Sequence, residues 1–184
     1  MYENIRRHSF MVARVADIIL QGLHAASSAP APPSRSLVVA GALMHDIAKT
    51  KCIREGCKHA DIGRDMCREL GFETIGEIVA NHVVLSEFNR KAYKEGYFSA
   101  IELVFYADKR VKHDQVVPLR ERLEYIIDKY SNNEAIREDY IRKNFEQCQE
   151  VEHYLFTRLD FSPDEITSFL PDSPADLLHY LPER

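Results

Sequence analysis

Six residues with side chains that suit metal binding fall on the inward-facing stripes of the expected helices. They are His8, His45, Asp46, His59, His82 and Asp108. His8, for example, is in line with Val12 and Ile19 at helical spacing. A buried carboxylate needs a paired charge or a metal, and imidazoles with carboxylates are the ligand set of zinc, iron, manganese or nickel. These residues therefore predict a metal centre.

The adjacent pair His45 and Asp46 decides how many ions such a centre would hold. Successive residues of a helix point about 100° apart, so Asp46 reaches the ion held by His45 only if it leans across the site. A carboxylate placed in that way can bridge two ions. We therefore expect one or two divalent ions (Fe, Mn, Ni or Zn), the first held by His8, His45, Asp46 and Asp108 and the second by Asp46, His59 and His82. Paired ions serve phosphoryl transfer, which predicts hydrolysis of a phosphate ester or anhydride.

The candidate catalytic residues are Asp46 and Lys49. Lys49 follows Asp46 by about one helical turn, so it could hold a substrate phosphate or the charge of the transition state; a solvated helix end is the open alternative. Lys109 and Arg110 follow Asp108 and could also meet a phosphate, but ion pairs with surface carboxylates are the simpler explanation. No side chain stands out as a nucleophile, so a hydroxide formed on the metal is the expected attacker.

Hydrophobic periodicity and long proline-free spans predict an all-α fold with the metal site between the central helices. The expected helices cover residues 3–23, 35–49, 58–70, 73–83, 100–112, 118–130 and 133–159. Residues 25–36 and 86–98 are expected loops, and Ser162 begins a capped helical segment. The aromatic residues of the second loop could stack on a base, but packing onto the core is the simpler interpretation. No alternating pattern predicts a strand.

Composition excludes several classes of protein. The 184 residues suit one domain, which we place at residues 1–160 with a short appendage at 161–184. A net charge of −5, with basic residues spread singly and in pairs, argues against duplex nucleic acid as the main partner. The longest apolar run, residues 37–44, is too short to span a membrane. No secretory signal is visible, so we expect a cytoplasmic protein with four free thiols.

Five ordered motifs resemble those of the HD superfamily of metal-dependent phosphohydrolases. RRHSFMVARVA carries His8, GALMHDIAK carries His45 and Asp46, and FYADKR carries Asp108. KHADIGRDM and IVANHVV, with His59 and His82, resemble the extra histidines of the dinuclear branch. The resemblance implies a compact helical HD-domain bundle that acts on a nucleotide or another small phosphorylated substrate.

Within this superfamily the layout is similar to that of bacterial symmetrical dinucleoside tetraphosphate hydrolases. It departs from their pattern at Ile5, where those enzymes usually carry an arginine, and in the segment KRVKHDQVV after Asp108. A second His-Asp pair, His113-Asp114, is interpreted as a solvated helix end.

Three alternatives stay open. The residues Cys52, Cys57, His59 and Cys67 could form a structural zinc site. The resemblance also covers HD-domain di-iron oxygenases, which use a similar set of six ligands. A non-catalytic nucleotide-sensing domain is the third alternative. The sequence leaves the physiological substrate, the native metal and the oligomeric state open.

Overall fold

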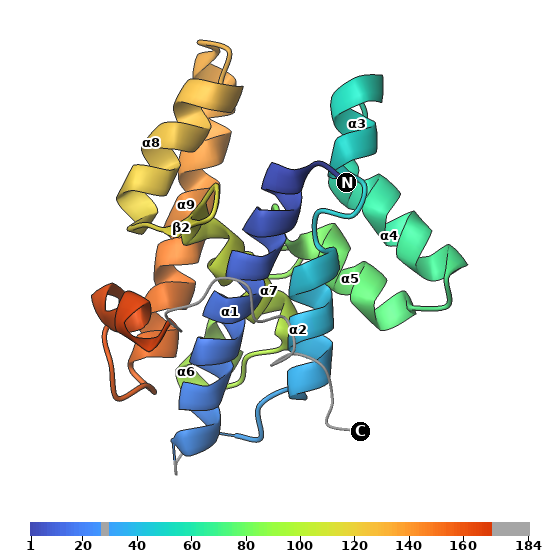
Figure 1. Ribbon diagram of the computed structural model, residues 1–184. Helices are drawn as coiled ribbons and strands as arrows, with labels where there is room; N and C mark the ends of the chain where they lie inside the picture. Colours follow the sequence, from blue (N-terminus) through green and yellow to red (C-terminus); the bar gives the residue numbers. More distant parts are fainter. Residues whose placement is uncertain (27–29, 171–184) are drawn as a thin grey trace.

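The fold is all-α, as the sequence predicts (Figure 1). A computed structural model describes residues 1–26 and 30–170. Within those ranges the elements are α1 (Glu3–Ala25), α2 (Arg35–Met44), α3 (Lys49–Glu55), α4 (His59–Glu69), α5 (Glu73–Asn81), α6 (Arg90–Glu95), α7 (Ala100–Lys109), β1 (Val111–Lys112), β2 (Gln115–Val116), α8 (Leu119–Tyr130), α9 (Ala135–Phe156) and the 3-10 helix η1 (Pro163–Phe169).

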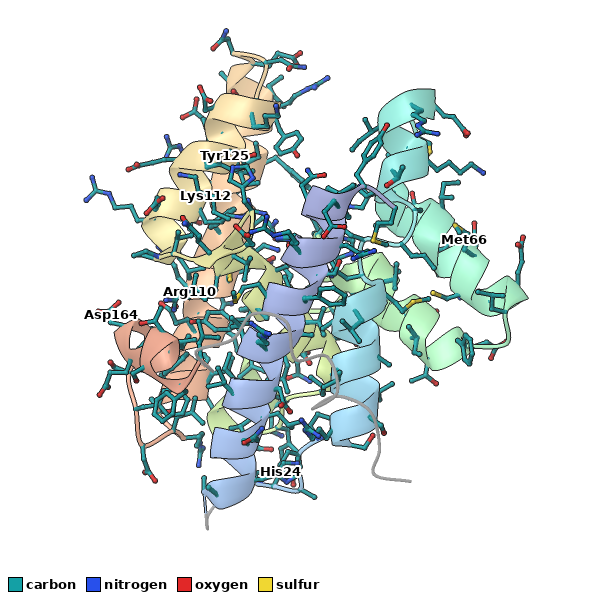
Figure 2. The ribbon with its side chains drawn as sticks, in the orientation of Figure 1. His24, Met66, Arg110, Lys112, Tyr125 and Asp164 are labelled. Atoms are coloured by element: carbon teal, nitrogen blue, oxygen red, sulfur yellow. A yellow bond between two sulfur atoms is a disulfide. The ribbon has the colours of Figure 1, made fainter. Side chains whose placement is uncertain are left out.

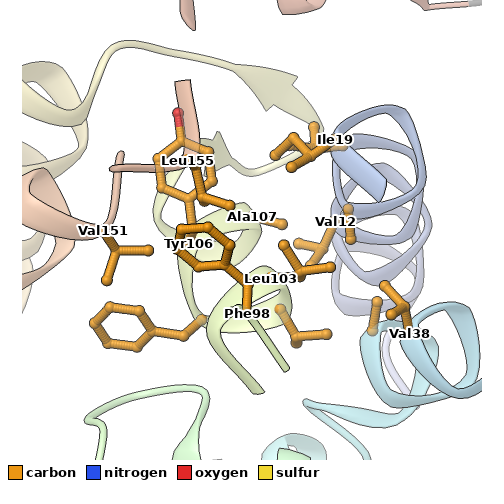
Figure 3. Packing of buried hydrophobic residues seen from close by; sticks show 14 of the residues in the cluster. Val12, Ile19, Val38, Phe98, Leu103, Tyr106, Ala107, Val151 and Leu155 are labelled. Atoms are coloured by element: carbon orange, nitrogen blue, oxygen red, sulfur yellow. The ribbon is translucent and has the colours of Figure 1, made fainter. Parts of the chain in front are cut away.

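Helix α7 is the centre of the bundle. It contacts α1, α2, α5, α8 and α9. Its residues Leu103, Tyr106 and Ala107 are fully buried, and Figure 3 shows them between Val12 of α1 on one side and Leu155 of α9 on the other. A capping box between Ser99 and Glu102 starts the helix. Because α7 is held on several sides, it is a rigid support for Asp108 near its C-terminal end.

The predicted helix 35–49 is two helices separated by a tight turn. Helix α2 ends at Met44, and the amide of Ile47 then donates to the carbonyl of Met44 at 2.9 Å, while the amide of Lys49 donates to the carbonyl of Asp46 at 2.9 Å. These short-range hydrogen bonds replace the regular helical ladder. His45 and Asp46 are both fully buried in the turn. A turn between the two helices thus holds both adjacent side chains in the interior.

The segment after Asp108 also differs from the prediction. Helix α7 ends at Lys109, and β1 pairs with β2 in an antiparallel hairpin with Val111 opposite Val116. His113 lies in the connecting turn with a φ of 59°, so the pair His113-Asp114 is not a helix end. The strands have two residues each, which is too short for an alternating pattern to be recognised.

The loop predicted at residues 86–98 contains the short helix α6. Its aromatic residues Tyr93 and Phe98 are buried and stacked, with ring centroids 5.6 Å apart. The core-packing interpretation therefore holds for these two rings.

The prediction of four free thiols is wrong for Cys52 and Cys57, which form a disulfide. Helix α3 ends at Gly56, which has a φ of 71°, and the reversal brings the two Cα atoms to 4.6 Å. Cys67 and Cys148 are free and buried. The alternative of a zinc site is contradicted by the same bond, because disulfide sulfurs are not thiolate ligands.

The C-terminal part of the described chain packs against the bundle. Ile166 of η1 is fully buried, and Arg110, labelled in Figure 2, donates through its Nη2 to the carbonyl of Pro163 at 3.0 Å. Residues 171–184 of the predicted appendage lie outside the described residues. Among the described helices, none combines the length and apolar character that a membrane crossing requires.

Candidate metal centre

All six predicted ligands meet at one place. His8 comes from α1, His45 and Asp46 from the turn after α2, His59 from the first turn of α4, His82 from the C-terminal cap of α5, and Asp108 from α7. His45 and Asp46 are adjacent, and the five segments that carry the six residues are separated by the length of a helix or more in the sequence. The tertiary structure therefore gathers the set that the helical stripes predict.

One group of donor atoms surrounds Asp108. Its Oδ1 lies 2.9 Å from His8 Nε2 and 3.7 Å from His45 Nε2. Ligand atoms from these three residues lie within 4.8 Å of one another. Two imidazoles and one carboxylate are a suitable donor set for a divalent transition metal.

A second group surrounds Asp46, whose two oxygens face different partners. Oδ1 lies 3.3 Å from His59 Nε2 and 3.6 Å from His82 Nε2. Oδ2 lies 3.4 Å from His45 Nε2 and accepts a hydrogen bond from Lys49 Nζ at 2.8 Å. Ligand atoms of His45, Asp46 and His82 lie within 4.8 Å of one another. His45 belongs to both of these compact triads, whereas the sequence predicts Asp46 as the shared ligand.

The backbone orients three of the four imidazoles. The Nδ1 atoms of His45 and His82 lie 2.6 Å from the carbonyls of Ala42 and Val79, and His8 Nδ1 lies 2.8 Å from the carbonyl of His113. Because a carbonyl only accepts, each Nδ1 carries the proton. Each Nε2 then faces the site, where it can bind a metal in the form that carries no proton on that atom.

The electrostatics of the carboxylates favour a cation. Burial would raise the pKa of Asp46, but His45 and Lys49 outweigh it and hold that pKa well below its usual range. Burial likewise acts on Asp108, and the hydrogen bond from His8 again lowers the pKa of the carboxyl well below its usual range. Both side chains are therefore ionised at neutral pH.

The pKa values of His45 and His82 shift in opposite directions. Burial lowers the pKa of His82 to about 4, which keeps it neutral at pH 7, the form that binds metals. Burial also opposes charge on His45, but Asp46 and Asp108 outweigh it and raise the pKa of His45. A bound cation would supply the positive charge that these carboxylates favour.

Two buried donor atoms of the site lack hydrogen-bond partners among the described residues, which also fits a metal. His45 Nε2 and Asp46 Oδ1 are buried and have no hydrogen-bond partner within the described part of the chain. His59 Nε2 and His82 Nε2 face each other at 3.1 Å, which requires a proton or a metal between two nitrogen lone pairs. Buried polar atoms without partners are rare in folded proteins. These donors match the requirements of a divalent ion.

Of the two residues after Asp108, Arg110 forms an ion pair with a half-buried carboxylate, whereas Lys109 contacts backbone carbonyls. Lys109 is buried, and its Nζ donates to the carbonyls of His82 and Val83 at 3.1 and 3.0 Å. Arg110 is also buried and pairs with the half-buried Glu152 at 3.0 Å. Both residues support the fold behind the site. Lys109 also contacts a predicted ligand, because it donates to the backbone carbonyl of His82.

Two residues near the site were missed from the sequence. Arg122 of α8 is buried and its Nη2 lies 3.9 Å from Asp108 Oδ1. A signal was present, because Arg122 falls on the apolar stripe of Leu119, Leu123 and Ile126. The other is His113, whose backbone carbonyl orients His8. No sequence pattern identifies a carbonyl that acts from a turn.

Two cavities border the donor atoms. The first has a volume of about 340 Å³ and is lined by His59, His82, Asp108 and apolar residues of α8 and α9. The second has a volume of about 320 Å³ and is lined by His8, Asp46, Lys129 and Tyr125, the last labelled in Figure 2. Lys49 and Arg122 line both cavities. A substrate can therefore approach the carboxylates where these two cations lie.

Comparison with known proteins identifies the family. The family model described as HD domain matches residues 5–133, and the matched span contains all six donor residues. Searches of curated proteins and of solved structures find no match. The dinuclear branch and the similarity to tetraphosphate hydrolases stay predictions. Because this family model matches more than half of the sequence, the chain belongs to the HD domain family, whose members are generally metal-dependent phosphohydrolases.

Proposed function

We propose that the protein is a divalent-metal-dependent phosphohydrolase that cleaves a phosphate ester or anhydride in a nucleotide or another small phosphorylated substrate. The observation that carries this proposal is the division of Asp46, whose Oδ2 faces His45 and Lys49 while its Oδ1 faces His59 and His82. A carboxylate in that position can serve two ions. The family membership supports the same class of reaction.

The residues have separate tasks in this proposal. His8, His45, Asp46, His59, His82 and Asp108 would hold one or two ions of Fe, Mn, Ni or Zn. Such ions supply a Lewis acid for the phosphoryl group and lower the pKa of water. The backbone carbonyls behind His8, His45 and His82 keep these imidazoles in the tautomer that binds.

Lys49 acts on the substrate side. It is half-buried, lines both cavities and donates to Asp46 at 2.8 Å. The negative charge of Asp46 outweighs the effect of burial and raises the pKa of Lys49, so the amine stays charged. A fixed cation beside the reacting phosphate would stabilise the charge that develops in the transition state.

The test begins with metal analysis of protein purified without a chelator. The full chain is then screened for phosphate release from nucleotides and simple phosphate esters with Mn²⁺, Fe²⁺ and Ni²⁺. We expect activity that chelation abolishes and that metal restores. Asp46→Ala should lose both metal and activity, whereas Asp65→Ala, at an exposed position on α4, should keep both.

Two results would contradict the proposal. Phosphate release that survives exhaustive chelation would exclude the metal. Oxygen consumption by the iron-loaded protein, without phosphate release under any metal, would instead support the oxygenase.

A further inference from the structure

The wall of the 340 Å³ cavity beside the metal centre combines two chemically different sets of residues. One set is Lys49, Asp108 and Arg122, together with the imidazoles of His59 and His82. The rest of its wall is largely apolar, with Ile126 and Tyr130 from α8, Tyr140, Ile141 and Phe145 from α9, and Ile53 from α3. Figure 1 shows α3 and the α8–α9 pair on opposite sides of the N-terminal end of α1. The cavity suits a molecule with one charged end and one apolar end.

Arg122 lacks a hydrogen-bond partner at one atom. Its side chain is 8% exposed, and its buried Nε has no partner in the described residues. Within the described residues, the guanidinium forms an ion pair with Asp108 at 3.9 Å and a cation–π contact with Tyr125, whose ring centroid lies 5.4 Å from Cζ. A guanidinium presents donors in a planar fork that matches phosphate oxygens. Arg122 therefore has the position and the free donor to bind a phosphate.

Asn144 places an acceptor on the wall of the same cavity. Its Nδ2 donates to the carbonyl of Val83 at 2.8 Å, which identifies the other atom as the oxygen. That Oδ1 is buried and has no partner in the described part of the protein. An N–H or O–H group on a ligand would satisfy it.

Apolar side chains are also exposed around this cavity. Ile53, Tyr130 and Tyr140 line it, and they are 61%, 49% and 59% exposed. Exposed apolar residues that gather at one pocket indicate a binding surface. The volume lies at the lower end of the range for ligand pockets, so there is room for one ring system rather than a long chain.

We propose that Arg122 binds the substrate's phosphate and that the apolar cavity binds an aromatic organic group attached to it. This inference rests on the proposed function and names its substrate class: aromatic phosphate monoesters, preferred over polyol phosphates and pyrophosphate. Arg122 and Lys49 approach the phosphate from α8 and α3 respectively. Asn144 selects rings that carry a hydrogen-bond donor.

The test measures binding without turnover. The full chain loaded with Mn²⁺ is titrated calorimetrically with phenylphosphonate and with methylphosphonate, which share the non-hydrolysable anionic group and differ in the ring. We expect phenylphosphonate to bind at least about tenfold more tightly. Tyr140→Ser, at an exposed position, should reduce this preference and leave the affinity for methylphosphonate unchanged. Equal affinities of the unaltered protein for the two phosphonates would overturn the aromatic subsite.

Arg122 is tested with two substitutions and a matched control. Arg122→Gln should weaken both phosphonates by roughly tenfold or more without loss of bound Mn²⁺, and Arg122→Lys should recover part of the affinity. Arg120→Gln, on the same helix with its side chain 89% exposed, should bind like the unaltered protein. Unchanged binding by both Arg122 variants would overturn its role. If phosphonates bind as expected but no phosphate ester is cleaved under any metal, the proposed function fails and this binding site stands.

Discussion

Lys49 Nζ lies 2.8 Å from Asp46 Oδ2, on the carboxylate whose other oxygen faces His59 and His82. The lysine begins α3, immediately after the turn that buries Asp46. The carboxylate of Asp46 thus connects the imidazole cluster to the charged amine of Lys49, which lines both cavities. This contact lets the role of Lys49 be separated from the roles of the donors.

Lys49→Ala should lower turnover and leave the metal content unchanged. Loss of a donor that stabilises transition-state charge costs about 10²-fold in rate, and the six imidazole and carboxylate donors remain in place. Metal per chain and turnover on a phosphate ester are measured together. The control is Lys51→Ala on the same helix, whose side chain is about half exposed. Parallel loss of metal and activity would show that Lys49 supports the metal site rather than the substrate.

His59→Ala tests the number of ions. His59 contacts Asp46 and His82 but lies outside the triad of His8, His45 and Asp108. If the protein holds two ions, His59→Ala should retain about one ion per chain, the one beside His8. His8→Ala should lose that ion and keep the one beside His59. Mass spectrometry of metals in the purified variants gives the count, and His24→Ala, in the last turn of α1, is the control. One ion in the unaltered protein would contradict the dinuclear prediction.

Metal should stabilise the fold. A ligand at about 100 times its dissociation constant stabilises the native state by roughly 2.7 kcal/mol. For 150–250 residues each kcal/mol shifts the melting temperature by about 2–4 °C, so chelation should lower it by roughly 5–11 °C. Thermal melts with and without chelator measure the shift. Asp108→Ala should reduce it and Cys52→Ser should not; the reverse pattern would place the metal at the cysteine loop.

The cysteines should titrate in two classes. Denatured but unreduced protein should show two thiols per chain, because Cys52 and Cys57 are paired, and prior reduction should raise the count to four. In the folded protein Cys148 should react very slowly, since burial raises the pKa of its thiol to about 12. A thiol-reactive chromophore gives the counts. Four thiols in freshly purified, unreduced protein would contradict the disulfide.

Lys109 should give stability a pH dependence. Burial lowers the pKa of Lys109 to about 8, from an ordinary value of 10.5. Between these values the unfolded chain holds more protons on this lysine than the folded chain does, so its contribution to the free energy of unfolding rises with pH. The free energy of unfolding of the unaltered protein, minus that of Lys109→Met, should therefore increase from pH 8 to pH 10.5. Urea unfolding measures it, with the exposed Lys91→Met as the control; a constant difference would contradict the shifted pKa.

Local patterns in the sequence were sufficient to predict the class of fold and to single out the six side chains that the structure brings together. Helical periodicity is a property of neighbouring residues, so His8, His82 and Asp108 could be placed on inward faces before any packing was known. The same periodicity could have marked Arg122, since it shares a stripe with Leu119 and Ile126. The order of the main helices followed from the same signal, whereas the division of the predicted helix 35–49 into α2 and α3 did not.

The tertiary structure decided how those residues meet. The separate contacts of the two Asp46 oxygens, the approach of Arg122 to Asp108 and the carbonyl of His113 behind His8 each join different segments of the chain. The turn after Met44 and the reversal at Gly56 redirect the chain over a few residues. Periodicity reports which face of a helix is buried. It contains no information on what that face contacts, because those contacts depend on the directions taken by turns and on packing between helices distant in sequence.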